Sequence, residues 1–144
     1  MAVITEIIHI RSKGENDMID ITASVSKAIE GSKFKQGIVT IFIAGSTAAV
    51  TTIEYEPGLK TDFPKMLSRI APNNIEYEHD GTWHDGNGHS HVRASLVGPS
   101  LTIPIKDSRL LLGVAANSRG GNGYQTKRTK GHTANNGRVN ISTV

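Results

Sequence analysis

Short runs of β-branched and other apolar residues, bounded by Gly, Pro, Asn, Asp or Ser, recur along the chain and constrain its fold most. Runs of this kind predict β-strands. Turn residues at 14–17 join the first two runs, which predicts an opening hairpin. The run after Gly37 is continuous enough to predict a strand buried on both faces. The predicted strands cover residues 3–10, 18–21, 39–44, 48–53, 92–97, 101–105 and 110–114.

Only two stretches have the spacing of an amphipathic helix. The first has Thr22 as its predicted N-cap and Gly31 where it would stop, and the second has Asp62 as its predicted cap and ends before Pro72. Because strands dominate and the two helices are isolated, we predict a single compact α+β domain with a mostly antiparallel sheet. The apolar stripes consist of Ile21, Val25 and Ile29, and of Leu59, Phe63, Met66, Leu67 and Ile70.

Length and composition bound the class of protein. A chain of 144 residues fits one ordinary domain. It contains no cysteine, so a metal would have to use imidazole and carboxylate ligands. No run of about 18 apolar residues occurs, and Glu6 and His9 interrupt the apolar N-terminal stretch, so we expect no membrane partner, no export and a cytoplasmic location.

The net charge of +3 comes entirely from the end of the chain. Residues 114–144 hold five basic and no acidic residues, which leaves 11 basic and 13 acidic residues in the body. Neither part combines basic residues with a series of aromatic ones, as single-strand binding would require. We therefore expect no nucleic-acid partner.

Histidines crowd into one polar segment, residues 73–90, whose composition predicts a loop or a site. Four of the six histidines fall within thirteen residues: His79, His84, His89 and His91. If the following run is a strand, His89, His91, Arg93 and Ser95 share one face, with Asp85 and Asn87 arriving from the preceding turn. Such a face can hold a divalent metal or bind a phosphate.

An alternative without any ligand stays open for this segment. The sequence Asp85-Gly86-Asn87-Gly88 is also a tight-turn sequence that needs no ligand. Outside it, Glu54 follows a predicted buried strand, a common place for a catalytic acid. The chain contains no nucleophile elbow, P-loop or dinucleotide-binding fingerprint.

Residues 45–50 with 53–58 form one motif, and residues 85–96 with 98–100 form a second. These two stretches resemble the first and second motifs of the YjbQ-like proteins, also called uncharacterised protein family 0047, some of which are described as secondary thiamine-phosphate synthases. The resemblance covers roughly residues 1–113. It implies an α+β domain that assembles as a homotrimer, with a polar site near a subunit boundary.

The resemblance also implies roles for the polar residues. It implies a divalent metal, zinc or magnesium, and a phosphorylated small-molecule ligand. The activity would be thiamine-phosphate synthase-like transfer, with metal-dependent phosphoester hydrolysis or a non-catalytic, trimeric metal- or anion-binding module as alternatives. The metal ligands would be His79, Asp85, His89 and His91; the catalytic residues Glu54, Asp85 and His89; and the substrate-binding residues Asn87, Arg93 and Ser95.

The chain departs from the family pattern at two places. Many bacterial members begin the first motif with histidine, where this chain has Gly45. After residues 110–113 the family continues with Thr, Trp, two Gln and an apolar strand, whereas this chain reads Val114-Ala115-Ala116-Asn117. A one-base shift of suitable codons restores Trp-Gln-Gln-Ile. We therefore predict that residues 114–144 are an atypical, frame-shifted tail, which sequencing of the gene tests directly. If the tail is genuine, we expect it to be loosely held.

Overall fold

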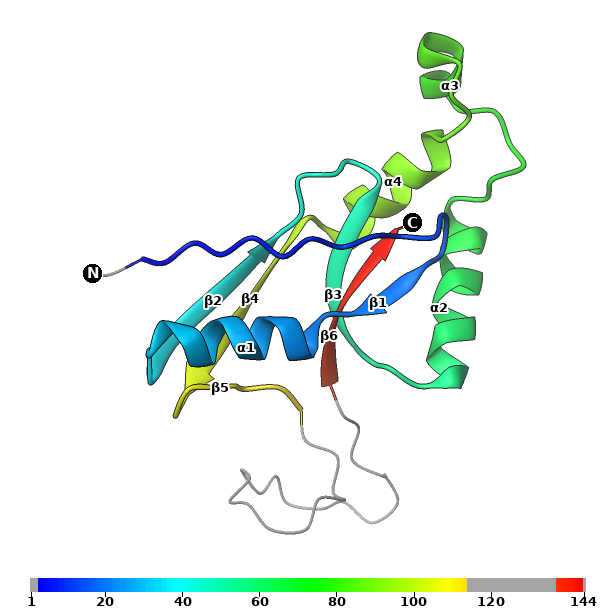
Figure 1. Ribbon diagram of the computed structural model, residues 1–144. Coiled ribbons are helices and arrows are strands. Elements are labelled where there is room, and N and C mark those ends of the chain that lie inside the picture. Colours follow the sequence, from blue (N-terminus) through cyan, green and yellow to red (C-terminus); the bar gives the residue numbers. More distant parts are fainter. Residues whose placement is uncertain (1–2, 114–136, 144) are drawn as a thin grey trace.

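The computed structural model describes residues 3–113 and 137–143. It contains six strands and four helices in this part of the chain, drawn in Figure 1. In chain order these are β1 (Met18–Asp20), α1 (Thr22–Ser32), β2 (Gln36–Phe42), β3 (Ala48–Glu54), α2 (Pro57–Ile70), α3 (Glu78–Trp83), α4 (Gly88–Val97), β4 (Ser100–Lys106), β5 (Arg109–Leu110) and β6 (Gly137–Thr143).

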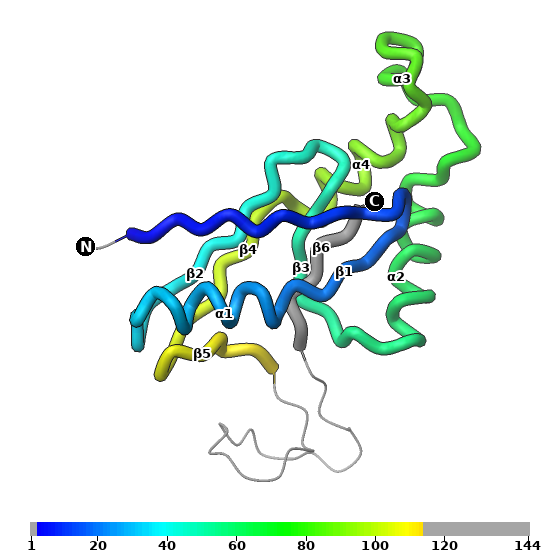
Figure 2. The backbone as a smooth tube through the Cα atoms, in the orientation of Figure 1, coloured from blue at the N-terminus to red at the C-terminus, as the bar shows by residue number. Residues whose placement is uncertain are grey.

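All strand pairs are antiparallel, and they form two three-stranded sheets, β1-β6-β3 and β2-β4-β5. The backbone trace in Figure 2 shows β3 of the first sheet next to β4 of the second. The Val50 N–H of β3 donates to the carbonyl of Gly98, two residues before β4, at 3.1 Å. The α+β class predicted from the sequence is confirmed, with four helices in place of the two expected.

Helices pack on both faces of β3. Val50 joins a core with α1 and β4, whereas its neighbour Ala49 joins a second core with Leu67 of α2 and Ala94 of α4. Adjacent residues of a strand point to opposite faces, so β3 separates the two cores. The first core consists of Ile21, Val25, Ile29, Val50, Ile103 and Ile105.

The two predicted helices are present, with different caps. The N-cap of α1 is Ile21, and the Thr22 N–H is bound by the Asp20 carboxylate at 2.9 Å. The side chain of Glu56 caps α2 by accepting from two backbone N–H groups of its first turn. Asp62 is therefore not the cap, because Pro57 already starts the helix one turn earlier.

The largest error concerns residues 92–97, predicted as a strand and found in helix α4. The buried residues of α4 are Gly88, His89, Ser90, Arg93 and Ala94, a helical spacing. Since these residues are small or polar, a search for apolar periodicity does not detect them. The segment 73–90, predicted as a loop, likewise contains α3 and the start of α4.

Three strand predictions also need correction. Residues 3–10 are extended and exposed but belong to no sheet of the described chain, so there is no opening hairpin; β1 pairs with β6. Strand β2 alternates between exposed and half-buried residues, so it is not buried on both faces. Strand β5 ends at Leu110, and the predicted end at residue 114 lies outside the described residues.

The tail contributes a strand to the fold. Strand β6 lies between β1 and β3 and pairs with all seven residues of β3. A segment paired on both sides is not loosely held, so that expectation is wrong for residues 137–143. Residues 114–136 lie outside the described part, and the frame-shift and domain boundary stay predictions. Among the described residues, no helix is long and apolar enough to cross a membrane.

Candidate metal centre

Helices α3 and α4 meet at a glycine that allows their close approach. The Gly88 N–H donates to the Asp80 carboxylate at 2.8 Å. A Cβ atom at Gly88 would lie 2.5 Å from Cβ of Tyr77, so no side chain fits there. Between the helices, the chain turns tightly through His84 at φ 57° and Gly86 at φ 66°. This turn and the packing of Gly88 place the side chains of α3 against those of α4.

Three potential metal ligands gather at this junction, one from α3, one from the turn and one from α4. One ligand atom each from His79, Asp85 and His91 lies within 4.8 Å of the other two. Nε2 of His79 lies 3.6 Å from Oδ1 of Asp85, and the rings of His79 and His91 have centroids 4.2 Å apart. Ligands about 2.1 Å from a tetrahedral zinc ion lie about 3.4 Å apart, so small side-chain rotations suffice.

The His79 imidazole has an unused polar atom facing this group. Its Nε2 is buried and forms no hydrogen bond with any residue that the structure describes. A buried polar atom without a partner is costly, and a bound cation would satisfy it. Asp85 is 41 % exposed, which leaves the site open to solvent and to a ligand. The donor set of two imidazoles and one carboxylate therefore fits a divalent metal with an open position.

His89 and Arg93 lie on another face of α4 and do not join this group. Arg93 is 1 % exposed and donates to the Ala71 carbonyl at 2.8 Å and to Glu15 at 2.6 Å. Nε2 of His89 lies 3.4 Å from the same Glu15 carboxylate. The prediction that His89, His91, Arg93 and Ser95 share a face is wrong, because in a helix residues four apart share a face and residues two apart do not.

The charge of Glu15 is favoured by this environment. Burial by itself raises the pKa of its carboxyl, but the hydrogen bond from Arg93 and the positive charges of His89 and Arg93 outweigh burial, and the pKa falls below its ordinary value of 4.5. A carboxyl with a lowered pKa in the folded state stabilises the protein above its unfolded-state pKa. This contribution is lost as the pH falls through the folded-state pKa.

Acid unfolding tests this pairing. Below about pH 4.5, the free energy of unfolding of the wild type should fall more steeply than that of Glu15→Gln, which carries no titrating group at this position. Urea titrations at a series of pH values, with a chelator present, measure both slopes. Parallel profiles for the two proteins would show that Glu15 is not paired in the folded state.

Asn87 and Ser95 have local roles in the structure. The Asn87 carbonyl accepts the Ser90 N–H at 2.8 Å and so starts α4. Its side-chain oxygen is buried and accepts no hydrogen bond from residues 3–113 or 137–143. Ser95 donates its hydroxyl hydrogen to the His91 carbonyl at 2.8 Å. It also lines a shallow hollow of about 340 Å³ with His91, Val92 and Leu96, next to the three-ligand group.

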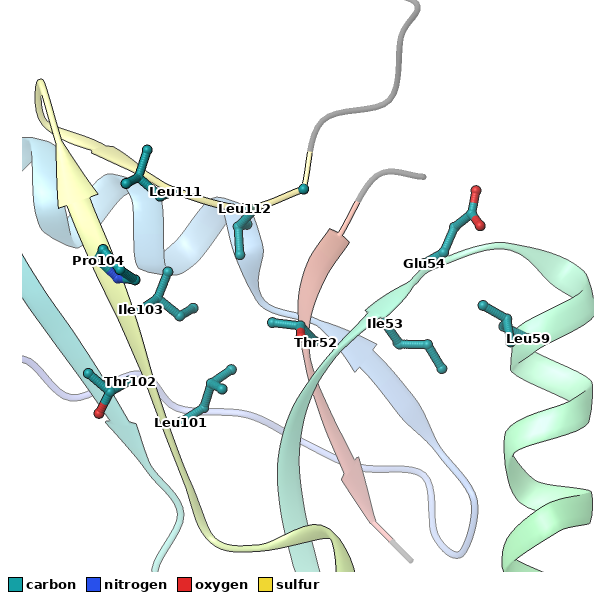
Figure 3. A pocket seen from close by; sticks show the side chains of 11 residues that line it. Thr52, Ile53, Glu54, Leu59, Leu101, Thr102, Ile103, Pro104, Leu111 and Leu112 are labelled. Atoms are coloured by element: carbon teal, nitrogen blue, oxygen red, sulfur yellow. The ribbon is translucent and has the colours of Figure 1, made fainter. Parts of the chain in front are cut away.

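Glu54 lies at the end of β3 opposite to α3 and forms no part of the histidine group (Figure 1). It is at the rim of a cavity of about 480 Å³ between β3 and β4. Figure 3 shows the Glu54 carboxylate turned away from Leu101 and Ile103, which together with Ile53 form apolar walls. The role of Glu54 as a catalytic partner of Asp85 and His89 is therefore not supported by its position.

Of the predicted site residues, the structure brings together His79, Asp85 and His91, and separates Glu54, His89 and Arg93 from them. The residue that sequence reasoning missed is Glu15. It lies 78 positions before Arg93, in a turn whose Gly, Asn and Asp residues predict only a loop. No local signal could have indicated this pairing.

The chain matches the family model described as UPF0047 protein YjbQ-like over residues 6–117. It is 38 % identical over 106 residues to a UPF0047 protein of Methanocaldococcus jannaschii, covering 73 % of this chain and 74 % of the relative. It is 29 % identical over 108 residues to UPF0047 protein YugU of Bacillus subtilis, covering 74 % and 79 %.

Solved structures of YjbQ-like proteins have a similar fold. A YbjQ-like protein of unknown function from Sulfolobus solfataricus has a TM-score of 0.70 at 25 % identity, covering 92 % of this chain and 80 % of that one. A YjbQ/UPF0047 family protein from Clostridium acetobutylicum has a TM-score of 0.69 at 25 % identity, covering 92 % and 85 %. This protein is an α+β domain with a candidate metal-ligand group between two helices. It belongs to the YjbQ-like UPF0047 family.

Proposed function

We propose that this protein binds a divalent metal ion through His79, Asp85 and His91, and that the site acts on phosphorylated small molecules by metal-dependent hydrolysis. The observation that carries the proposal is the convergence of three ligand atoms around a buried, unpartnered imidazole nitrogen. Two imidazoles favour zinc over magnesium, which prefers oxygen ligands. When bound, the metal supplies Lewis-acid chemistry to a phosphoryl oxygen.

Transfer of the thiamine-phosphate synthase kind has less support from the geometry. That reaction was expected to use Arg93 to bind substrate and Glu54 as a catalytic residue. Arg93 is 1 % exposed and committed to Glu15 and Ala71, so it is not available to a ligand from solvent. The metal alone would then have to neutralise a leaving pyrophosphate. A non-catalytic, trimeric metal-binding module remains the alternative of a different class.

Metal titration tests the site. His79→Ala, Asp85→Asn and His91→Ala should each weaken zinc binding by about 100-fold or more, because loss of even a supporting partner of a ligand costs about 10–100-fold. Isothermal titration calorimetry against a competing chelator measures the affinity. His84→Ala is the matched control, since His84 is exposed in the same turn and outside the group. The proposal would be overturned if all four variants bound zinc as tightly as the wild type, or if the wild type bound no zinc.

Activity assays on the metal-loaded protein separate the three functions. Release of phosphate from 4-nitrophenyl phosphate that is abolished by Asp85→Asn supports hydrolysis. Release of pyrophosphate only when a pyrimidine diphosphate and a thiazole phosphate are both present supports transfer. Stoichiometric metal without either reaction supports the binding module, and light scattering shows whether its mass is three times 15.5 kDa.

A further inference from the structure

We infer that Glu15 is a positioning residue for this metal site, acting through the helix that carries His91. The inference rests on the proposed function, because the site that it concerns is the group of His79, Asp85 and His91. Glu15 itself is not a ligand: its carboxylate contacts Arg93 and His89, on a different face of α4.

The turn at residues 14–17 holds Glu15 against α4. Within it, the Asp17 N–H donates to the Gly14 carbonyl, the Lys13 N–H donates to the Asp17 carboxylate at 2.8 Å, and Asn16 takes a left-handed φ of 62°. The Glu15 carboxylate then accepts from Nη1 of Arg93 at 2.6 Å. This contact joins the start of the chain to a helix that begins more than 70 residues later.

Arg93 extends the connection to a third element. Its Nε donates to the carbonyl of Ala71, directly after α2, and its Nη2 contacts Oγ of Ser68 within α2 at 3.5 Å. Three segments of the chain therefore meet at one guanidinium that is 1 % exposed. Burying a guanidinium that has only neutral acceptors would strongly lower the stability of the fold. The negative charge of the Glu15 carboxylate offsets this cost.

The geometry of α4 connects this contact to the metal site. His89 and Arg93 are four residues apart and lie on the face held by Glu15. His91 lies about half a turn around the helix axis from both, and its ring packs on that of His79. A shift or rotation of α4 that relieves an unpaired Arg93 would move His91 relative to α3. Partners that orient ligands in this indirect way contribute about 10–100-fold to metal affinity.

The test compares Glu15→Gln with Glu30→Gln, which removes an exposed carboxylate from the end of α1. Both variants are studied at a temperature where each is fully folded, as shown by its unfolding curve. Glu15→Gln should weaken zinc binding by about 10-fold or more and change the visible spectrum of the cobalt-substituted protein. Glu15→Asp, which keeps the charge, should recover part of the affinity. Glu30→Gln should match the wild type.

A second readout does not depend on metal. In the metal-free protein, Glu15→Gln should shift the imidazole NMR signals of His79 and His91 and speed amide exchange in α4 by about tenfold, with little change in α1. If the wild type binds no zinc, the proposed function fails, and these signals still decide whether Glu15 positions His79 and His91. Imidazole signals of Glu15→Gln that match those of the wild type would overturn the inference. If the wild type binds zinc, shifted signals in Glu15→Gln with the same zinc affinity as the wild type would overturn it as well.

Discussion

Replacing Arg93 with alanine should lower the free energy of unfolding by about 3–5 kcal/mol, the largest single effect expected in this chain. The side chain is 1 % exposed and has partners in the N-terminal turn, in α2 and after α2. Its removal leaves the Glu15 carboxylate without its main counter-charge and opens a void between α2 and α4. Urea denaturation followed by circular dichroism measures the loss.

A matched control and a double variant separate charge from packing. Arg69→Ala removes an exposed arginine from the last turn of α2 and should change stability by about 0.5 kcal/mol or less. The double variant Glu15→Gln with Arg93→Met removes both charges and keeps volume, so it should be more stable than Arg93→Ala. If Arg93→Ala cost no more than Arg69→Ala, the buried network described above would be wrong.

Gly88→Ala should be the second large effect, at about 3 kcal/mol of stability, the upper part of the range for overpacking. The new Cβ would lie 2.5 Å from Cβ and 2.9 Å from Cγ of Tyr77, so α3 and α4 must move apart. Because His79 and His91 lie on these two helices, zinc affinity should also fall by about 10-fold or more. Thermal unfolding and metal titration on the same sample measure both changes.

Gly81→Ala is the control for helix propensity. Gly81 lies in α3, and a Cβ there would meet nothing within 4 Å. Alanine in an exposed helix position should therefore stabilise the protein by about 0.5–1 kcal/mol without changing metal affinity. A Gly88→Ala protein as stable as the wild type would mean that the two helices do not meet as closely as the structure shows.

The parts of the fold that were predictable from the sequence are those whose buried face is apolar. Helix α1 follows from Ile21, Val25 and Ile29, and all three are among the buried core residues. Strand β3 and most of β4 follow from their β-branched runs in the same way. In these elements, hydrophobic burial and local preference indicate the same structure, so a local pattern suffices.

Helix α4 was missed because its buried face is polar. Arg93 is buried with an ion pair to Glu15, and His89 is buried beside the same carboxylate; neither apolar periodicity nor strand preference detects such contacts. The β-branched Val92 and Val97 instead favoured a strand. The same limit explains residues 3–10, which have strong strand preference but join no sheet among the described residues. It also explains β6, whose place between β1 and β3 depends on long-range pairing.

The segment that holds the candidate site was predictable from its composition, but which of its residues come together was not. The crowding of histidine with Asp85 identified the segment, since imidazole and carboxylate are the available metal ligands in a chain without cysteine. Assigning the members needed the helix, because a helical period puts His91 against His79 and turns His89 toward Glu15. Glu54 lies apart from this group at the other end of β3, and a position at the end of a strand gave no information about which residues lie near it.

The most direct measurement is anomalous diffraction at the zinc absorption edge from crystals of the zinc-loaded protein. The account predicts one strong peak within bonding distance of Nε2 of His79, a carboxylate oxygen of Asp85 and the imidazole of His91, and none beside Glu54. A peak bound by His89 and Glu15, or no peak at full zinc loading, would contradict the assignment of the metal site.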